Sequence, residues 1–205
     1  TVLEVRRESP REVVLTLATP LPAGYGAGDA VENADWQCAV VFRNNSVLRN
    51  RARGALFTTP HPVLVESNRF ERSTSSAILF AGDAEGWYES GACRDVVIRG
   101  NLFVDCMTAF SPHGLGRALI TFNPSVRKPA ARRRCYHSGI VIEGNRFETF
   151  RVPLVYAFST EDVVWRDNEV IWNGDYPPVG EDGPFVWKDC KGVRVSGGVV
   201  REGFC

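Results

Sequence analysis

The stretch VVIRGNLF, residues 96–103, decides the fold that we predict for this chain. It places apolar residues at alternate positions, as in a strand with one buried face, and an asparagine five positions after Val96. The same phrase recurs in varied form as VVFRNNSV, VLVESNRF, IVIEGNRF, VVWRDNEV and a decayed VRVSGGVV. These copies begin at residues 40, 63, 140, 163 and 193.

The asparagine keeps its place in five copies, and a glycine replaces it in the sixth: Asn45, Asn68, Asn101, Asn145, Asn168 and Gly198. Two of the intervals, 45 to 68 and 145 to 168, are 23 residues. Asparagine tolerates the left-handed backbone of a sharp corner, and stacked asparagines can hydrogen-bond as a ladder. One such unit cannot bury its apolar face alone, so stacking has to supply the core. We therefore predict an all-β protein, a right-handed parallel β-helix of about six coils.

A second apolar strand follows in each coil and begins at residue 55, 77, 118, 153 or 184. From there to the next phrase takes 8, 10 or 9 residues in the first, fourth and fifth coils, but 19 and 22 in the second and third. The extra length therefore falls at one corner of neighbouring coils. We expect these loops to lie side by side and build a wall, where binding and catalytic residues gather on a rigid scaffold.

Residues 1–37 do not fit the repeat. They read as antiparallel strands joined by Pro- and Gly-rich turns, and the composition changes at residues 35–37. We predict that residues 1–37 are the end of a small antiparallel β-barrel or hairpin domain, and that residues 38–205 form the coils. Because the chain begins in the manner of a strand interior, we interpret it as a piece of a longer protein.

Composition excludes several classes of function. The formal net charge is zero, so no overall field attracts nucleic acid or an anionic membrane, and no apolar run approaches a membrane span of about 20 residues. None of the six cysteines has zinc spacing, and no nucleotide or metalloprotease motif is present, so we expect no metal and no cofactor. Cys93 and Cys135 precede the asparagines of consecutive coils by 8 and 10 residues. Stacked strands about 4.8 Å apart suit a disulfide between them, and a disulfide would imply export.

The loop from Gly82 to Asp95 gathers carboxylates and aromatic side chains, among them Asp83, Trp87, Tyr88 and Glu89. An aromatic face packs against the apolar face of a sugar ring, while carboxylates accept hydroxyl protons or perform acid–base chemistry. This pattern predicts a sugar site in which Asp83 and Glu89 are the catalytic candidates. The alternative is that Trp87 plugs the loop against the β-helix and that the acids are merely solvated.

Basic residues offer further candidates. Arg51 and Arg53 precede the second strand of the first coil, and Thr58 and Thr59 end it, one coil from Asp83. Either arginine could hold a sugar hydroxyl or pair with Asp83, although a structural salt bridge explains it as well. We interpret the histidines as surface or turn residues and the run RKPAARRR, from residue 127, as a solvated loop tip, with binding of an anionic ligand as its alternative.

The run from ENADW through RARGALFTTP to AGDAEGWYESGAC resembles glycoside hydrolase family 110 over about residues 29–106. This family consists of bacterial exo-acting α-galactosidases that cleave terminal α-1,3-linked galactose with inversion, including that of the blood-group B antigen. The resemblance implies a β-barrel-like insertion before these coils. It also associates the catalytic aspartates with an Asp-Asp pair upstream, and this chain contains none. On that basis Asp83 and Glu89 become binding residues, together with Arg53, Trp87 and Tyr88.

The leading hypothesis is therefore the substrate-binding, C-terminal part of an inverting α-1,3-galactosidase, secreted or in the cell envelope of a bacterium. Its expected partner is a galactose-terminated oligosaccharide or glycoconjugate, and the open coil end predicts association with missing N-terminal coils or with another copy. One alternative is a non-catalytic carbohydrate-binding or structural β-helix. The other is a lyase or epimerase acting on uronates, in which Arg51 and Arg53 would serve.

Overall fold

The computed structural model describes residues 1–27, 29–83, 86–89, 91–109, 114, 116–125, 134–180 and 183–202. The chain divides into two compact units, Thr1–Val31 and Glu32–Cys205. Within the described residues, every regular element except the short 3-10 helix η1 (Ala34–Trp36) is a β-strand. No helix in this part of the chain is long and apolar enough to cross a membrane.

The first unit contains an antiparallel hairpin of β1 (Val2–Ser9) and β2 (Glu12–Leu17). Apolar side chains on both strands are exposed, Leu3 and Val5 among them. A hairpin of two strands is marginally stable in water. That it is the end of a larger barrel stays a prediction, and the division after Val31 lies six residues before the boundary that we expected from the composition.

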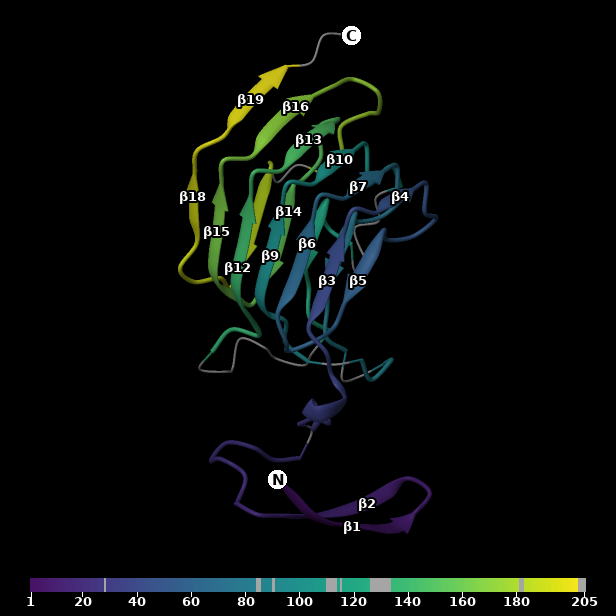
Figure 1. Ribbon diagram of the computed structural model, residues 1–205, viewed down its shortest axis with the longest axis vertical. Helices are drawn as coiled ribbons and strands as arrows, with labels where there is room; N and C mark the ends of the chain where they lie inside the picture. The colour runs from purple at the N-terminus through teal and green to yellow at the C-terminus, as the bar shows by residue number, and fades with distance from the viewer. Residues whose placement is uncertain are drawn as a thin grey trace. The chain divides into compact units, whose positions relative to one another are not determined.

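The second unit consists of three parallel sheets (Figure 1). Sheet one contains β3 (Val40–Arg43), β6 (Val63–Glu66), β9 (Arg94–Arg99), β12 (His137–Glu143), β15 (Thr160–Arg166) and β18 (Arg194–Ser196). Sheet two contains β4 (Ser46–Leu48), β7 (Arg69–Glu71), β10 (Leu102–Val104), β13 (Arg146–Thr149), β16 (Glu169–Trp172) and β19 (Val199–Glu202). Sheet three contains β5 (Ala55–Phe57), β8 (Ile78–Phe80), β11 (Ile120–Phe122), β14 (Val155–Phe158) and β17 (Phe185–Lys188).

The strand register follows the repeated phrase. The first residues of five copies are partners across sheet one: Val40, Val63, Val96, Ile140 and Val163. Each strand therefore pairs with the corresponding strand one coil later, although the coils differ in length. This confirms the predicted parallel β-helix.

The asparagine ladder runs along the ladder corner, where sheet-one strands end and sheet-two strands begin. The Asn68 backbone N–H and Nδ2 both donate to Oδ1 of Asn101, each at 2.9 Å, and Asn101 donates in the same way to Asn145. The left-handed backbone belongs to the residue before each asparagine and before Gly198, with φ between 54° and 62°: Asn44, Ser67, Gly100, Gly144, Asp167 and Gly197. We had assigned that conformation to the asparagine itself, which was wrong.

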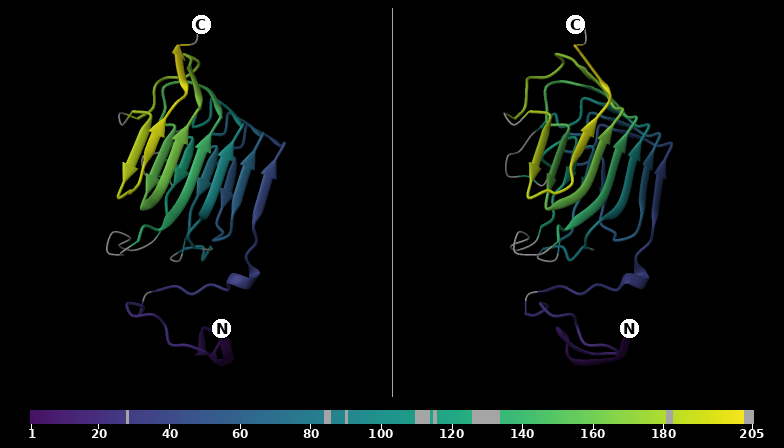
Figure 2. Two further views of the ribbon diagram at one scale, coloured as in Figure 1. Left: turned by 60° about the vertical axis from the view of Figure 1, so that its left-hand side comes forward. Right: turned by 90° about the vertical axis from the view of Figure 1, so that its left-hand side faces the viewer.

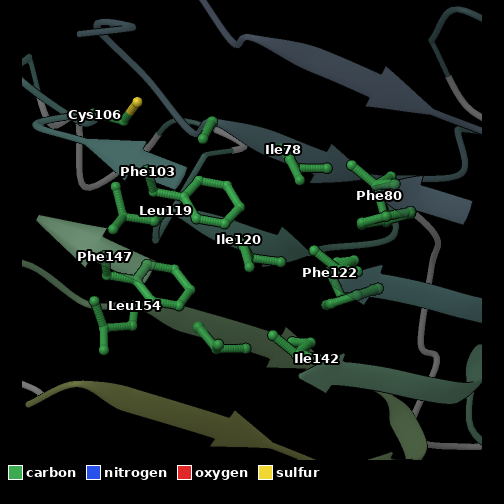
Figure 3. Close-up of a cluster of buried hydrophobic side chains, with 14 of the residues drawn as sticks. Ile78, Phe80, Phe103, Cys106, Leu119, Ile120, Phe122, Ile142, Phe147 and Leu154 are labelled. Carbon is green, nitrogen blue, oxygen red and sulfur yellow. The ribbon is translucent and has the colours of Figure 1, made fainter. Parts of the chain in front are cut away.

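Stacked aromatic rings fill the interior (Figure 3). Phe103 stacks on Phe147 with ring centroids 4.7 Å apart, and Phe80 stacks on Phe122 at 4.5 Å. Their planes are within 8° of parallel, because the parallel register repeats the same rotamer one coil later. The inner face of each strand thus joins a ladder of like side chains.

We expected the extra length at one corner only, and this was wrong. Segments 105–119 and 173–184 also lengthen the connections between sheet two and sheet three. At the end of the first segment, the Arg117 and Ala118 backbone N–H groups donate to Oγ1 of Thr121, a fully buried residue of β11. The three middle strands of sheet three, β8, β11 and β14, are buried on their outer face as well, so they lack the alternation of apolar and polar residues that marks a strand with one solvated face.

Candidate functional site

The predicted wall lies at the loop corner, where sheet-three strands end and the next sheet-one strands begin. Segments 81–93 and 123–136 leave sheet three there, and η1 lies on the same side of the β-helix in Figure 1 and in both views of Figure 2. An isolated bridge joins Asp83 to Ser125, so the two long connections lie side by side, as their positions in neighbouring coils require.

Asp83 anchors the first of these loops from within. It is 7% exposed; its Oδ1 accepts the Gly86 backbone N–H at 2.7 Å, and its Oδ2 accepts that of Trp87 at 3.0 Å. An isolated antiparallel bridge pairs Asp83 with Glu89, which is half-buried. A carboxylate with both oxygens committed to backbone amides orders the turn between them.

The aromatic residues of this loop face solvent. Trp87 and Tyr88 are each 81% exposed, so Trp87 does not plug the loop against the β-helix. Tyr88 has a φ of 55°, in the left-handed region that non-glycine residues rarely adopt. The loop thus presents two open aromatic faces beside the half-buried Glu89, which is the arrangement that stacking against a sugar ring requires.

A tyrosine from the next loop supports the wall from behind. A Cβ added to Gly82 would lie 2.1 Å from the Tyr136 hydroxyl oxygen and 2.9 Å from two of its ring carbons. Only glycine leaves room for this ring, which stands edge-on to the His137 ring with centroids 5.0 Å apart. The close approach of Tyr136 to Gly82 fixes the base of the aromatic loop.

The predicted arginines lie elsewhere. Arg51 and Arg53 are exposed and precede β5, whereas Asp83 follows β8, the partner of β5. They therefore occupy opposite ends of sheet three, about 20 Å apart at the usual strand rise. Neither arginine pairs with Asp83 or Glu89 in the described part of the structure.

The two threonines do lie at the loop corner. Thr58 is half-buried there. Thr59 is buried, donates its hydroxyl to the Cys38 carbonyl oxygen at 2.9 Å and accepts the His61 backbone N–H at 3.2 Å. Thr59 therefore fixes the turn that leads into sheet one.

The predicted disulfide is absent from the structure, where Cys93 and Cys135 are buried free thiols. The Cys93 sulfur donates to the Phe57 carbonyl oxygen and the Cys135 sulfur to that of Asp189, so they point to different coils. We had placed the two cysteines on stacked strands by counting back from Asn101 and Asn145. The loop insertions before each cysteine break that alignment. Burial raises the pKa of the Cys93 thiol to about 12, which leaves it protonated and inert.

His137 is fully buried, which corrects its interpretation as a surface residue. Its Nδ1 accepts the Cys93 backbone N–H at 3.1 Å, so the neutral ring carries its proton on Nε2. Burial lowers the pKa of His137 to about 3. The ring is therefore neutral at physiological pH. His113, Glu85 and the run RKPAARRR as far as residue 133 lie outside the described residues.

Two further features were not expected from the sequence. A groove of about 400 Å³ follows the ladder corner, lined by Glu66, Arg99, Glu143 and their neighbours. Its charged side chains form ion pairs from coil to coil, as in the 2.7 Å contact between Arg99 Nε and Glu66 Oε1, so these charges stabilise the stacked coils.

On sheet three, the Arg117 guanidinium lies 5.3 Å from the centroid of the Tyr156 ring and covers it. Among the described residues, no cluster of three or more His, Cys, Asp and Glu could hold a metal ion.

Comparison with known proteins identifies the relatives of this chain. It is 47% identical to an alpha-1,3-galactosidase B of Akkermansia muciniphila over 196 residues, which are 96% of this chain and 24% of the relative. It is 38% identical over 201 residues to an alpha-1,3-galactosidase B of Phocaeicola vulgatus, covering 95% of the chain and 33% of the relative. An alpha-1,3-galactosidase A of Bacteroides fragilis is 38% identical over 203 residues, with coverage of 98% and 33%.

The chain is a homologue of part of the α-1,3-galactosidases. No protein-family profile matches it. The resemblance predicted from the sequence is thereby confirmed, and it extends over almost the whole chain rather than residues 29–106 alone. This galactosidase homologue spans about a quarter to a third of the length of the curated relatives that it matches.

Proposed function

We propose that the chain forms the substrate-binding part of an enzyme that hydrolyses terminal α-1,3-linked galactose with inversion. The observation that carries this proposal is the pair of exposed aromatic faces, Trp87 and Tyr88, beside Glu89 in a chain similar to alpha-1,3-galactosidases. The galactose ring stacks on the aromatic faces, and Glu89 accepts hydrogen bonds from its hydroxyl groups. The substrate is a galactose-terminated oligosaccharide or glycoconjugate.

We assign Asp83 to loop anchoring rather than catalysis. Inverting hydrolysis needs a general acid at the leaving oxygen and a general base on the opposite face that activates water, about 6.5–9.5 Å apart. Asp83 is buried, and both of its oxygens accept backbone N–H groups of its own loop, which orders the turn. We infer that the acid and the base come from outside this chain.

A non-catalytic carbohydrate-binding module is the second candidate, since the chain spans only 24–33% of the curated relatives. The uronate lyase or epimerase hypothesis, in which Arg51 and Arg53 could serve as the base and the carboxylate-neutralising group, has no observation in its favour, since both arginines precede β5 and lie away from the aromatic residues of the loop corner. Secretion stays a proposal: the described cysteines are free thiols and provide no disulfide argument for export.

The test is hydrolysis of p-nitrophenyl α-galactoside and of an α-1,3-galactosyl disaccharide by this chain alone and by the whole enzyme that contains it, with the first anomer released observed by NMR. We expect this chain alone to bind the disaccharide without cleaving it, and the whole enzyme to cleave it with β-galactose appearing first. Replacing both Trp87 and Tyr88 with alanine should lower kcat/KM of the whole enzyme at least about tenfold, through loss of stacking.

The matched control is Tyr25→Ala, which removes an exposed aromatic residue from the other unit and should leave kcat/KM unchanged. Binding of the disaccharide without cleavage by the whole enzyme as well would favour the non-catalytic module. If the disaccharide is neither bound nor cleaved, both candidates are contradicted.

A further inference from the structure

The segment that leads into the first coil reaches the aromatic loop. The Gly91 backbone N–H donates to Oε2 of Glu32 at 3.1 Å, across 59 residues of sequence. A Cβ added to Gly91 would lie 3.0 Å from Oε1 of Glu32, so the carboxylate lies directly against the glycine backbone.

Two carboxylates therefore hold the aromatic loop, one at each end. Asp83 accepts the N–H groups of Gly86 and Trp87, and Glu32 accepts that of Gly91. Trp87 and Tyr88 lie between these attachments and are exposed. A loop fixed at both ends loses little conformational freedom when a ligand binds, which raises affinity without adding a contact to the ligand.

The same segment carries a third exposed aromatic residue. Trp36, at the end of η1, is 86% exposed. Its backbone is ordered by Asn33, whose Oδ1 accepts the Asp35 N–H at 3.0 Å and whose carbonyl oxygen accepts the Trp36 N–H at 3.3 Å. Past η1, the Thr59 hydroxyl holds the Cys38 carbonyl oxygen. The indole thus projects from a segment that is fixed on both sides.

The distribution of exposed aromatic residues is selective. Within the described part of the unit that begins at Glu32, the aromatic side chains that are exposed are Trp36, Trp87 and Tyr88. All three lie on the two segments that the Glu32–Gly91 hydrogen bond joins, whereas Trp165 and Trp172 are buried in the β-helix. Large exposed aromatic surface costs solvation free energy, so its concentration at one corner indicates a ligand that covers it.

We propose that Glu32 is a positioning residue for Trp87 and Tyr88, and that Trp36 stacks on the sugar that follows the terminal galactose. This inference rests on the proposed function, and it adds a second side to the site. Glu32 acts as a hydrogen-bond acceptor and not through its charge. Trp36 distinguishes a disaccharide from free galactose, because only the disaccharide has a second ring to cover it.

The test compares Glu32→Ala with Glu32→Gln, because glutamine keeps the acceptor and loses the charge. We expect Glu32→Ala to abolish hydrogen-exchange protection of the Gly91 amide and to weaken binding of an α-1,3-galactosyl disaccharide about fivefold, as for loss of one hydrogen bond. Glu32→Gln should retain both within about twofold. The control is Glu12→Ala, an exposed carboxylate of the other unit, which should change neither.

Trp36→Ala should weaken binding of the disaccharide about fivefold and leave binding of galactose unchanged. An equal loss in Glu32→Gln and Glu32→Ala would overturn the positioning role, because the charge would then be responsible. Unchanged disaccharide affinity in Trp36→Ala would overturn its stacking role. If the unaltered protein binds neither sugar, the proposed function fails and the sugar-binding roles fail with it. Exchange at Gly91 then still reports whether Glu32 holds the loop.

Discussion

Replacing Phe103 with alanine should lower the free energy of unfolding by about 4 kcal/mol, as for other fully buried phenylalanines. The ring is completely buried and lies between two others, with centroids 5.3 Å from Phe70 and 4.7 Å from Phe147. Its removal leaves a cavity that neighbouring coils cannot close, because the parallel sheets hold their spacing. Denaturant unfolding followed by far-ultraviolet circular dichroism measures the change.

The matched control for Phe103 is Leu102→Ala on the same strand. Leu102 is half-buried on the outer face of β10, and we expect a loss of about 1 kcal/mol there. Total stabilities of domains are about 5–15 kcal/mol, so the Phe103 variant would be severely weakened. Similar losses at both positions would contradict the central role of the stacked rings.

Replacing Asn101 with alanine should cost about 3 kcal/mol. The Asn101 side chain accepts two hydrogen bonds from Asn68 and donates to the Val65 carbonyl oxygen at 2.9 Å. Alanine leaves the Asn68 backbone N–H and the Val65 carbonyl oxygen buried without these partners, at about 1–3 kcal/mol for each group. The melting temperature and the free energy of unfolding report the loss.

Asn45→Ala provides the control for the ladder. Asn45 is the first asparagine of the ladder and is exposed, so water replaces its lost partners, and we expect a loss below about 1 kcal/mol. A graded effect along the ladder would show that burial, and not the asparagine as such, determines the cost. Equal losses at Asn45 and Asn101 would contradict this account.

The sequence predicts the β-helix well because its determinants are local and repeated. Val96 and Ile98 define the inner face of one strand, and Asn101 closes the same corner that Asn145 closes one coil later. The asparagine ladder also ends at the sixth copy of the repeated phrase, where Gly198 replaces the asparagine. A Cβ at Gly198 would lie 2.1 Å from the Asn168 carbonyl oxygen, so no asparagine fits there without a shift.

The candidate site is less predictable, since its geometry depends on contacts between distant residues. The carboxylates and aromatics of residues 83–89 are visible in the sequence, but the anchoring role of Asp83 and the exposure of Trp87 are not. Glu32 reaches Gly91 across 59 residues, and no local pattern marks that contact. The motif ENADW, with its turn-forming asparagine before a tryptophan, was the available signal for Trp36.

Errors in the predicted site have the same origin. The position of Arg53 was inferred by alignment along the chain, whereas strand direction places it at the start of sheet three and Asp83 beyond its end. The disulfide assumed a register that holds within strands and fails across insertions. Cys93 and Cys135 follow the two longest loop-corner connections, where spacing in sequence no longer measures distance.

The most direct test of the account is an NMR titration of the isotopically labelled protein with an α-1,3-galactosyl disaccharide. We predict that the largest shift changes fall on the Trp36 and Trp87 indole N–H groups and on the amides of Gly86 and Gly91. The amides around Glu66 and Arg99 in the ladder-corner groove should not move. Shift changes centred on that groove, or saturation without any change at the loop corner, would contradict the assignment of the sugar site.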